Sequence, residues 1–69
     1  MSSRLNIKLC DDDRARIERT RGRIGAASET EVIRRAVRLL DLASEHQAKG
    51  GRLVLRRNGA EDEVVRLVF

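Results

Sequence analysis

Three hydrogen-bonding side chains, Arg4, Asn6 and Lys8, alternate with apolar residues near the start of the chain. This period of two over residues 3–9 predicts a strand with one polar face and one apolar face. The apolar face consists of Leu5, Ile7 and Leu9. Arg and Lys side chains can hydrogen-bond to guanine in the major groove of DNA, and Asn can hydrogen-bond to adenine. The polar face therefore carries side chains that are suited to reading base edges.

The residue sets that enzymes and metal sites need are not visible in the sequence. The chain has a single Cys, Cys10, and a single His, His46, and it shows no Ser-His or Cys-His pairing. The adjacent acids at positions 11–13 fall where a helix is expected to begin, and neighbouring acids there rarely converge on one ion. We therefore expect no catalytic activity, no metal site and no cofactor.

The composition is basic and highly charged. The 69 residues include 15 Lys or Arg and 11 Asp or Glu, which gives a net charge of +4 and a pI near 10.6. A basic chain favours a polyanionic partner such as nucleic acid. Charged residues make up 38% of the sequence, so we expect no transmembrane helix and no secretory leader. The expected location is the cytoplasm, which suits a single thiol.

Two helices are predicted after the strand. The acids at positions 11–13 would start the first helix, because negative charge suits the positive end of the helix dipole and a carboxylate can cap free N–H groups. Gly25 would end this helix in a left-handed conformation. Ser28 and Glu31 have the spacing of a capping box, which predicts a second helix over roughly 29–47. Its apolar stripe contains Val32, Ile33, Ala36, Val37, Leu40 and Ala43, widened by Leu39 and Leu42.

Two β-prone runs flank the turn signal Asn58-Gly59 and predict a C-terminal hairpin over residues 52–68. A two-residue turn would place Arg57 opposite Ala60. A four-residue loop matches charges and apolar side chains better, so we favour it. The pairs of this favoured register are Arg57 with Asp62, Arg56 with Glu63, Leu55 with Val64 and Val54 with Val65.

The N-terminal strand has no neighbour in the sequence with which to pair, and unpaired strand edges are costly. A chain of 69 residues without a disulfide or a metal site is also marginally stable alone. A second copy meets both needs, because two strands related by a two-fold axis would form an antiparallel ribbon over a shared helical core. We therefore expect a mostly α fold with short β segments, organised as a homodimer.

The order of strand, short helix and capped second helix resembles the ribbon-helix-helix DNA-binding proteins of the Arc, methionine-repressor and CopG types. The run that carries the resemblance is residues 25–36, Gly-Ala-Ala-Ser-Glu-Thr-Glu-Val-Ile-Arg-Arg-Ala. The resemblance covers residues 3–47. It implies a DNA-binding and dimerisation domain over residues 1–47 and a β-hairpin extension over residues 48–69.

The resemblance also implies a role for particular residues. The outward strand side chains, which would contact bases, are Arg4, Asn6 and Lys8. The phosphate contacts would come from the start of the second helix, at Ser28, Glu29 and Thr30. Free N–H groups and the positive end of the helix dipole suit an anion there. The core of the dimer would contain Leu5, Ile7, Leu9, Val32, Ile33, Ala36, Val37 and Leu40.

The implied function is a transcriptional repressor that binds double-stranded operator DNA as a homodimer, with dimers able to pair into tetramers on adjacent half-sites. Many proteins of this family and size are antitoxins that repress their own operon. The hairpin would then bind a toxin or extend the dimer interface. Two alternatives stay open: a dimeric protein-interaction module, and an accessory DNA-binding protein of a plasmid relaxosome.

Overall fold

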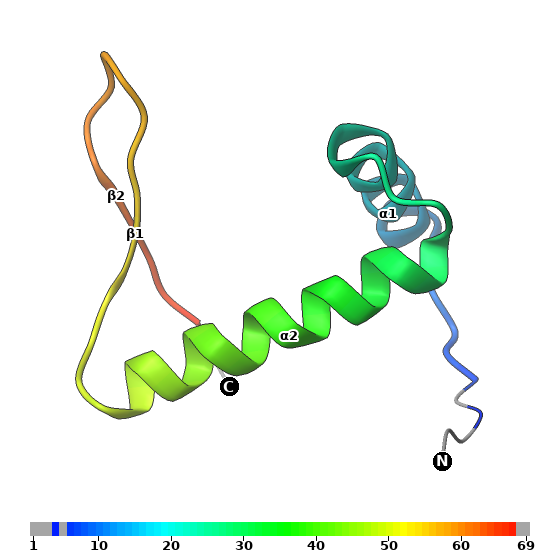
Figure 1. The fold of residues 1–69 in the computed structure, drawn as a ribbon, viewed down its shortest axis with the longest axis horizontal. Helices are drawn as coiled ribbons and strands as arrows, with labels where there is room; N and C mark the ends of the chain where they lie inside the picture. The colour runs from blue at the N-terminus through cyan, green and yellow to red at the C-terminus, as the bar shows by residue number, and fades with distance from the viewer. Residues whose placement is uncertain (1–3, 5, 68–69) are drawn as a thin grey trace. The chain divides into compact units, whose positions relative to one another are not determined.

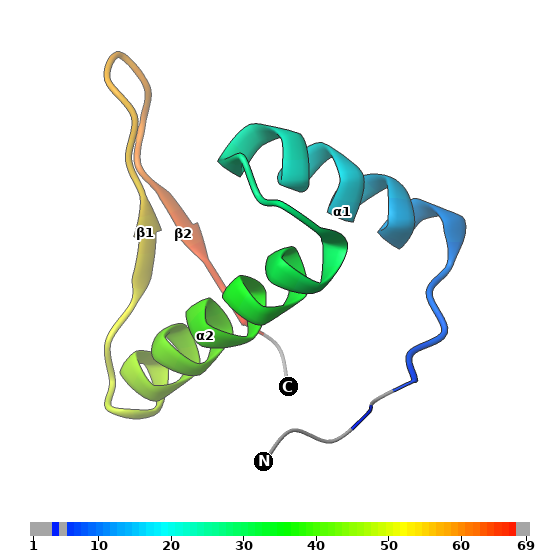
Figure 2. The same ribbon diagram turned by 45° about the vertical axis from the view of Figure 1, so that its right-hand side comes forward.

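The computed structural model describes Arg4 and residues 6–67. Two helices are followed by a two-stranded antiparallel hairpin (Figures 1 and 2). The elements are α1 (Asp11–Ile24), α2 (Glu29–Ala48), β1 (Leu53–Leu55) and β2 (Glu63–Val65). The chain divides into two compact units, Met1–Arg34 and Arg35–Phe69, with the boundary inside α2. The prediction of a mostly helical chain with two helices and a C-terminal hairpin is confirmed.

The helix α1 begins at Asp11, with Cys10 as its N-cap residue and no side-chain capping bond from that residue. The three acids lie in the first turn, where their charge favours the positive end of the helix dipole. They do not occupy the N-cap position itself. Gly25 ends the helix as predicted, with a φ of 67°. The following residue, Ala26, donates its N–H to the Arg21 carbonyl oxygen at 3.1 Å.

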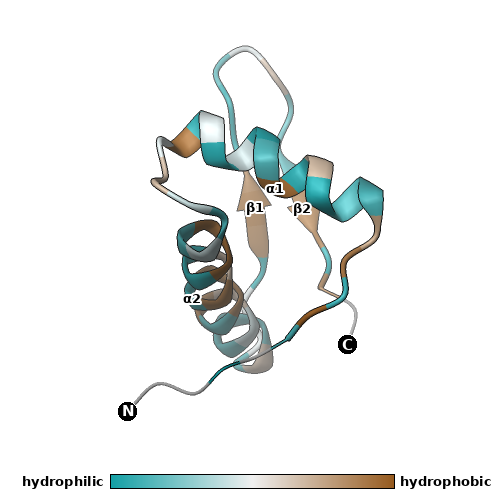
Figure 3. Cartoon of the chain, turned by 90° about the vertical axis from the view of Figure 1, so that its right-hand side faces the viewer, coloured by the Kyte–Doolittle hydropathy of each residue, from teal (hydrophilic) through white to brown (hydrophobic). Residues whose placement is uncertain are grey.

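The side chains of α1 interact mainly with one another, because no residue of this helix is buried. The Arg16 guanidinium bonds to the Asp13 carboxylate at 2.9 Å. Arg21 bonds to Glu18 through two guanidinium nitrogens, and the Thr20 hydroxyl donates to the Arg16 carbonyl oxygen at 2.8 Å. In Figure 3, α1 is accordingly mostly hydrophilic. Neighbouring side chains and end caps, rather than a core, supply the interactions seen in α1.

The C-terminal end of α2 is closed by two glycines. Gly50 has a φ of 86° and donates its N–H to the Gln47 carbonyl oxygen at 3.0 Å. Gly51 donates to the His46 carbonyl oxygen at 3.0 Å. These two bonds form a Schellman motif, which satisfies carbonyl groups at the helix end. A Cβ atom on Gly51 would stand 2.2 Å from His46 Nε2, so this position needs glycine unless the imidazole moves.

The hairpin has a register that the sequence did not predict. The favoured prediction paired Leu55 with Val64, and it is wrong by one residue. The observed pairs are Leu53 with Val65, Val54 with Val64, and Leu55 with Glu63. A shift of one residue in the pairing changes which side chains of the two strands lie on the same face of the hairpin. The correction therefore changes which residues share a surface.

The turn between the two strands is centred on Asn58 and Gly59. Gly59 has a φ of 79°, whereas Asn58 has a negative φ, so the turn cannot be type I′, which needs positive φ at both central residues. The Ala60 N–H donates to the Arg57 carbonyl oxygen at 3.2 Å, and positive φ at the third residue alone is typical of a type II turn. The ladder itself ends at Leu55 and resumes at Glu63, on either side of this turn.

The described residues bury little apolar surface. The buried apolar residues are Ala26, Val32 and Ala43, and no described side chain is completely buried. The exposed large apolar side chains of α2 are Val37, Leu39, Leu40 and Leu42. The apolar stripe predicted on α2 is therefore present (Figure 3), and several of its members are exposed.

The segment before α1 forms no strand in the part of the chain that the structure describes, which here is Arg4 and residues 6–10. A strand needs a partner for its backbone hydrogen bonds, and the partner that the sequence predicts is a second copy. The intermolecular ribbon therefore stays a prediction. Two of its positions, Ser3 and Leu5, lie outside the described residues.

Candidate nucleic-acid interface

The three predicted base-reading side chains, Arg4, Asn6 and Lys8, are all exposed. They precede α1 in the unit Met1–Arg34 (Figure 2). None of the three is engaged in a hydrogen bond or ion pair with another described residue. On the apolar side of the same segment, Ile7 is 48% exposed. The segment therefore has polar donors that are accessible to a ligand and an apolar side chain that is only partly covered.

The start of α2 has the predicted capping box. The Glu31 N–H donates to Ser28 Oγ at 3.2 Å, which is the bond expected from an N-cap serine. The Glu31 carboxylate accepts a hydrogen bond from the Ala27 N–H at 2.8 Å. In the standard capping box this bond comes from the N–H of the N-cap residue, which here is Ser28. These two bonds hold the loop before α2 and fix where the helix begins.

Backbone N–H groups are available at this helix end. The Val32 N–H donates to the Ser28 carbonyl oxygen at 3.3 Å, so Glu29 and Thr30 lie ahead of the first such intrahelical bond. Their N–H groups and the positive end of the helix dipole can bind an anion. The Glu29 carboxylate lies in the same turn and opposes this attraction. Any phosphate contact here is therefore made by the backbone and the serine hydroxyl.

The two predicted contact sets belong to the same unit but remain separate patches within it. One set precedes α1, and the other follows α1 at the start of α2. No hydrogen bond or ion pair between described residues joins the two sets. The structure thus brings both sets into one unit without merging them into a single site.

The predicted dimer core is largely uncovered in the single chain. Val32, which is 5% exposed, is the buried member among those described. Leu9 and Ile33 are half-buried, and Leu5 lies outside the described residues. The exposed members are Ile7, Ala36, Val37 and Leu40. Val37 is 62% exposed although it belongs to an apolar stripe, so its environment in the single chain does not explain its residue type.

The chain matches no protein-family model, no curated protein and no solved structure. Its function is therefore argued from its own residues. Across Arg4 and residues 6–67, no group of three or more His, Cys, Asp or Glu side chains is placed to hold a metal ion. Within the same ranges, neither helix combines the length and the apolar character needed to cross a membrane.

Ion pairs with carboxylates occupy several of the arginines, among them Arg16, Arg21 and Arg56. Hydrogen bonding with Arg21 lowers the pKa of Glu18, and the same bonds raise the pKa of Arg21. Hydrogen bonding with Arg56 likewise lowers the pKa of Asp62, at distances of 2.6 and 2.9 Å. These arginines are engaged with carboxylates in the chain itself. The hairpin arginines without such a partner among the described residues are Arg52, Arg57 and Arg66.

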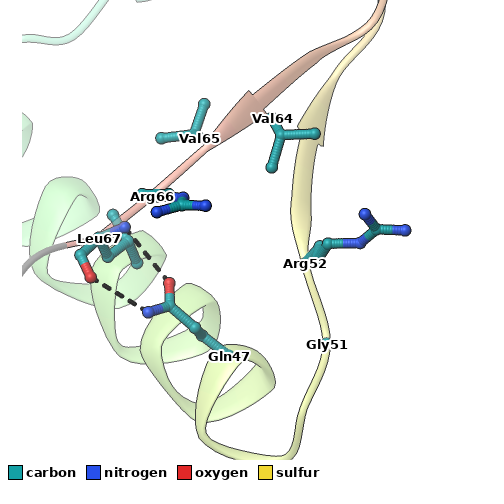
Figure 4. Close-up of a pocket in the computed structure, with 7 residues that line it drawn as sticks. All are labelled: Gln47, Gly51, Arg52, Val64, Val65, Arg66 and Leu67. Carbon is teal, nitrogen blue, oxygen red and sulfur yellow. Dashed lines mark hydrogen bonds between the residues drawn. The ribbon is translucent and has the colours of Figure 1, made fainter.

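The hairpin also brings together residues that sequence reasoning did not connect. Gln47 Nε2 donates to the Leu67 carbonyl oxygen at 3.1 Å, and Gln47 Oε1 accepts from the Leu67 N–H at 3.3 Å (Figure 4). No motif marks this contact, which joins positions 20 residues apart. The observed register further places Arg52 opposite Arg66, one step beyond the ladder. The predicted register would have placed Arg52 opposite Leu67.

Proposed function

We propose that this chain is a homodimeric, sequence-specific DNA-binding protein with a ribbon-helix-helix architecture. The observation that carries the proposal is the composition of the unit Met1–Arg34. In this unit, exposed Arg, Asn and Lys side chains at alternate positions precede α1, and a capped helix N-terminus follows it. The first set suits base edges and the second suits a phosphate. The net charge of +4 favours the same polyanionic partner.

The uncovered surface supports a second copy as the first partner. A stable protein interface buries about 800 Å² on each partner. The exposed apolar residues Val37 and Leu40 give α2 a face that such an interface would cover. In this dimer, α2 and its symmetry mate share one core.

Dimerisation would also complete the strand. Two copies of residues 3–9 would pair as an antiparallel ribbon, with Leu5, Ile7 and Leu9 over the helices. The outward face of the ribbon would then repeat Arg4, Asn6 and Lys8 across the two-fold axis. The major groove is wide enough to admit a two-stranded ribbon. The N–H groups at the start of each α2 would contact the flanking phosphates and fix the register of the ribbon on DNA.

The test begins with a duplex selected from random-sequence DNA by the wild-type protein. The variant in which Arg4, Asn6 and Lys8 are all replaced by Ala is expected to remain a folded dimer and to lose preference for this duplex over a scrambled one. The matched control replaces the same three residue types elsewhere, as Arg34→Ala, Lys49→Ala and Asn58→Ala. It is expected to retain the preference. A triple variant with undiminished preference would show that the bases are read by other residues.

The salt dependence of binding tests the phosphate contacts. Because bound cationic groups release counterions from DNA, the logarithm of the association constant should fall linearly with the logarithm of the salt concentration. The slope should be about −0.9 for each phosphate neutralised. Fluorescence anisotropy of a labelled duplex at several salt concentrations measures it. A slope near zero would contradict DNA binding by this chain.

The regulatory role that follows is repression. Dimers bound to adjacent half-sites would block a promoter, and pairs of dimers would bind as tetramers. If the chain is an antitoxin, the hairpin β1–β2 is the element that contacts the toxin. Co-expression with the product of the neighbouring gene tests this, and a complex that persists after deletion of the hairpin would exclude the hairpin as the contact.

A protein-interaction module is the second candidate. It is favoured by the exposed apolar side chains of the hairpin, Val54, Leu55 and Val64, which are 41%, 54% and 51% exposed. The two functions predict different gel-shift results at low ionic strength. A gel shift at low salt would detect even non-specific DNA binding by the proposed dimer, so its absence would favour the protein-interaction module.

A further inference from the structure

The observed register gives the hairpin two faces of different charge. Side chains alternate between faces along each strand, so the pairs Leu53–Val65 and Leu55–Glu63 share one face. The other face contains the pair Val54–Val64. Extending the ladder by one residue at each end adds Arg56 with Asp62 and Arg52 with Arg66 to this second face. We call the second face, made of Arg52, Val54, Arg56, Asp62, Val64 and Arg66, the arginine face.

The two ends of the arginine face differ in how their charges are balanced. At the end nearer the turn, Arg56 and Asp62 form an ion pair with two hydrogen bonds. At the other end, Arg52 and Arg66 lie one position beyond the last ladder pair, Leu53–Val65, and neither has an acidic partner among the described residues. Like charges that face each other across a strand pair are destabilising. One end of the hairpin therefore carries an ion pair, and the other carries two cations without an acidic partner among the described residues.

The arginine pair lies at an anchored part of the hairpin. Both residues line one hollow, together with Gln47 and Gly51 (Figure 4). The Gln47 side chain is engaged twice with the backbone of Leu67, the residue next to Arg66. On the other strand, Gly51 precedes Arg52 and is fixed by its bond to the His46 carbonyl oxygen. Figure 4 shows the Arg52 side chain on the segment before β1 and the Arg66 side chain on the segment after β2.

We propose that Arg52 and Arg66 form a binding site for a phosphate group. A guanidinium offers parallel N–H donors that match two oxygens of a phosphate, and charge-assisted bonds of this kind are stronger than neutral ones. A bound phosphate would also replace the repulsion between the two cations by attraction to a shared anion. The site is open to solvent, since both arginines are exposed, so it fits a phosphate on a large molecule as well as a free one.

The phosphate of a DNA backbone is the source that the charge of the chain favours, and this assignment of the source rests on the proposed function. Each copy would then contact DNA through the hairpin as well as through the ribbon. Because a backbone phosphate carries no sequence information, the hairpin would raise affinity without changing which sequence is preferred. This separates its contribution from that of Arg4, Asn6 and Lys8.

The experiment uses the full chain and two double variants with equal loss of charge. One is Arg52→Gln with Arg66→Gln, and the control is Arg34→Gln with Arg38→Gln on the exposed side of α2. The first variant is expected to bind the selected duplex at least about tenfold more weakly than the control. Its salt slope should be smaller by about 0.9 for each phosphate that the variant no longer neutralises. Thermal unfolding should show it to be no less stable than wild type, because the repulsion is removed.

A second arm uses inorganic phosphate alone. Titration of the wild-type protein, with chloride at equal ionic strength as the reference, should shift the NMR signals of the Arg52 and Arg66 guanidinium N–H groups. If phosphate shifts these signals but the duplex affinity of the double variant equals that of the control, the site stands and its phosphate is not that of DNA. If neither arm shows an effect, the proposal is wrong. Failure of the proposed function is recognised separately, because the phosphate arm requires no DNA.

Discussion

The two helices of this chain lie next to each other in the sequence but depend on different interactions. In α1 no residue is buried, and its visible interactions are ion pairs over three residues, an acidic first turn and a glycine at its end. In α2 an apolar stripe runs along the helix, with Val32 and Ala43 buried and Val37 and Leu40 exposed. The comparison separates a helix defined by neighbouring residues from one whose residue types make sense only with a partner surface.

This difference matters because local interactions rarely suffice. Isolated helices shorter than about 12–15 residues are marginal in water, and α1 has 14 residues. Exposed ion pairs such as that between Glu18 and Arg21 contribute little to stability. An apolar face such as that of α2 contributes to the free energy of folding only where it is removed from water, and we propose that a second copy covers it.

The largest effect is expected at Leu40, which is 45% exposed in the single chain. If a second copy covers it, Leu40→Ala should lower the free energy of unfolding by about 2–5 kcal/mol. If it stays exposed, the change should be within about 0.5 kcal/mol. Urea unfolding at two protein concentrations measures the difference. The control Arg38→Ala, on the charged side of α2, should have little effect. Equal losses of unfolding free energy in Leu40→Ala and Arg38→Ala would show that the apolar side of α2 is not covered by a partner.

The end of α1 should respond next. Gly25 has a φ of 67°, so Gly25→Ala should destabilise the protein by about 1–2 kcal/mol through backbone strain. Gly22 lies within α1 and has open space around its Cβ position. Gly22→Ala should therefore stabilise by roughly 0.5–1 kcal/mol. Gly25→Ala should therefore lower the midpoint of thermal unfolding, and Gly22→Ala should raise it. Shifts of the same sign would disagree with the left-handed glycine at the end of α1.

A smaller effect is expected at the start of α2. Ser28→Ala removes the acceptor of the Glu31 N–H bond and should cost about 1 kcal/mol of stability. The control Ser44→Ala removes a hydroxyl that donates to the Asp41 carbonyl oxygen inside the helix. Such bonds contribute nothing favourable to helix stability, so the control should be neutral. Denaturant unfolding compares the two, and a neutral Ser28→Ala would argue against the capping box.

The smallest effect concerns acid. The pKa of Asp62 is lowered by its hydrogen bonds with Arg56, so this pair stabilises the hairpin at pH values above the ordinary Asp pKa. That contribution is lost as the pH falls below about 4 and the carboxylate is protonated. The Hα chemical shifts of β1 and β2 should move toward random-coil values over this range. In Asp62→Asn the same shifts should change less with pH, and an unchanged response would assign the effect to another group.

Signals within four residues of each other allowed most of the local structure to be predicted. Gly25 ends α1 because a positive φ suits glycine, and Ser28 with Glu31 starts α2 because their spacing fits the cap. Both signals act over one helical turn, so no distant residue can override them easily. The alternation of Arg4, Asn6 and Lys8 likewise predicted side chains that the structure leaves exposed, whereas their contact with bases remains a prediction.

The hairpin could not be predicted as well, because its register depends on the backbone of a single turn. Pairing charged and apolar residues favoured a four-residue loop, but a shift of one residue retained an ion pair, between Arg56 and Asp62 instead of Arg57 and Asp62. The observed register is neither of the two that the sequence suggested, and the negative φ of Asn58 excludes the type I′ turn expected of a two-residue loop. The contact of Gln47 with Leu67 joins positions that are distant in the sequence, so no periodic pattern of residues predicts it. The opposed arginines were missed for the same reason, since they follow from the register.

Analytical ultracentrifugation of the free protein tests whether α2 presents its apolar face to a second copy of the chain. We expect a sedimenting mass of twice 7.8 kDa, with dissociation on dilution accompanied by loss of helical circular dichroism. A folded species of 7.8 kDa that keeps its helical signal on dilution would contradict the account, and with it the symmetric ribbon that is proposed to read DNA.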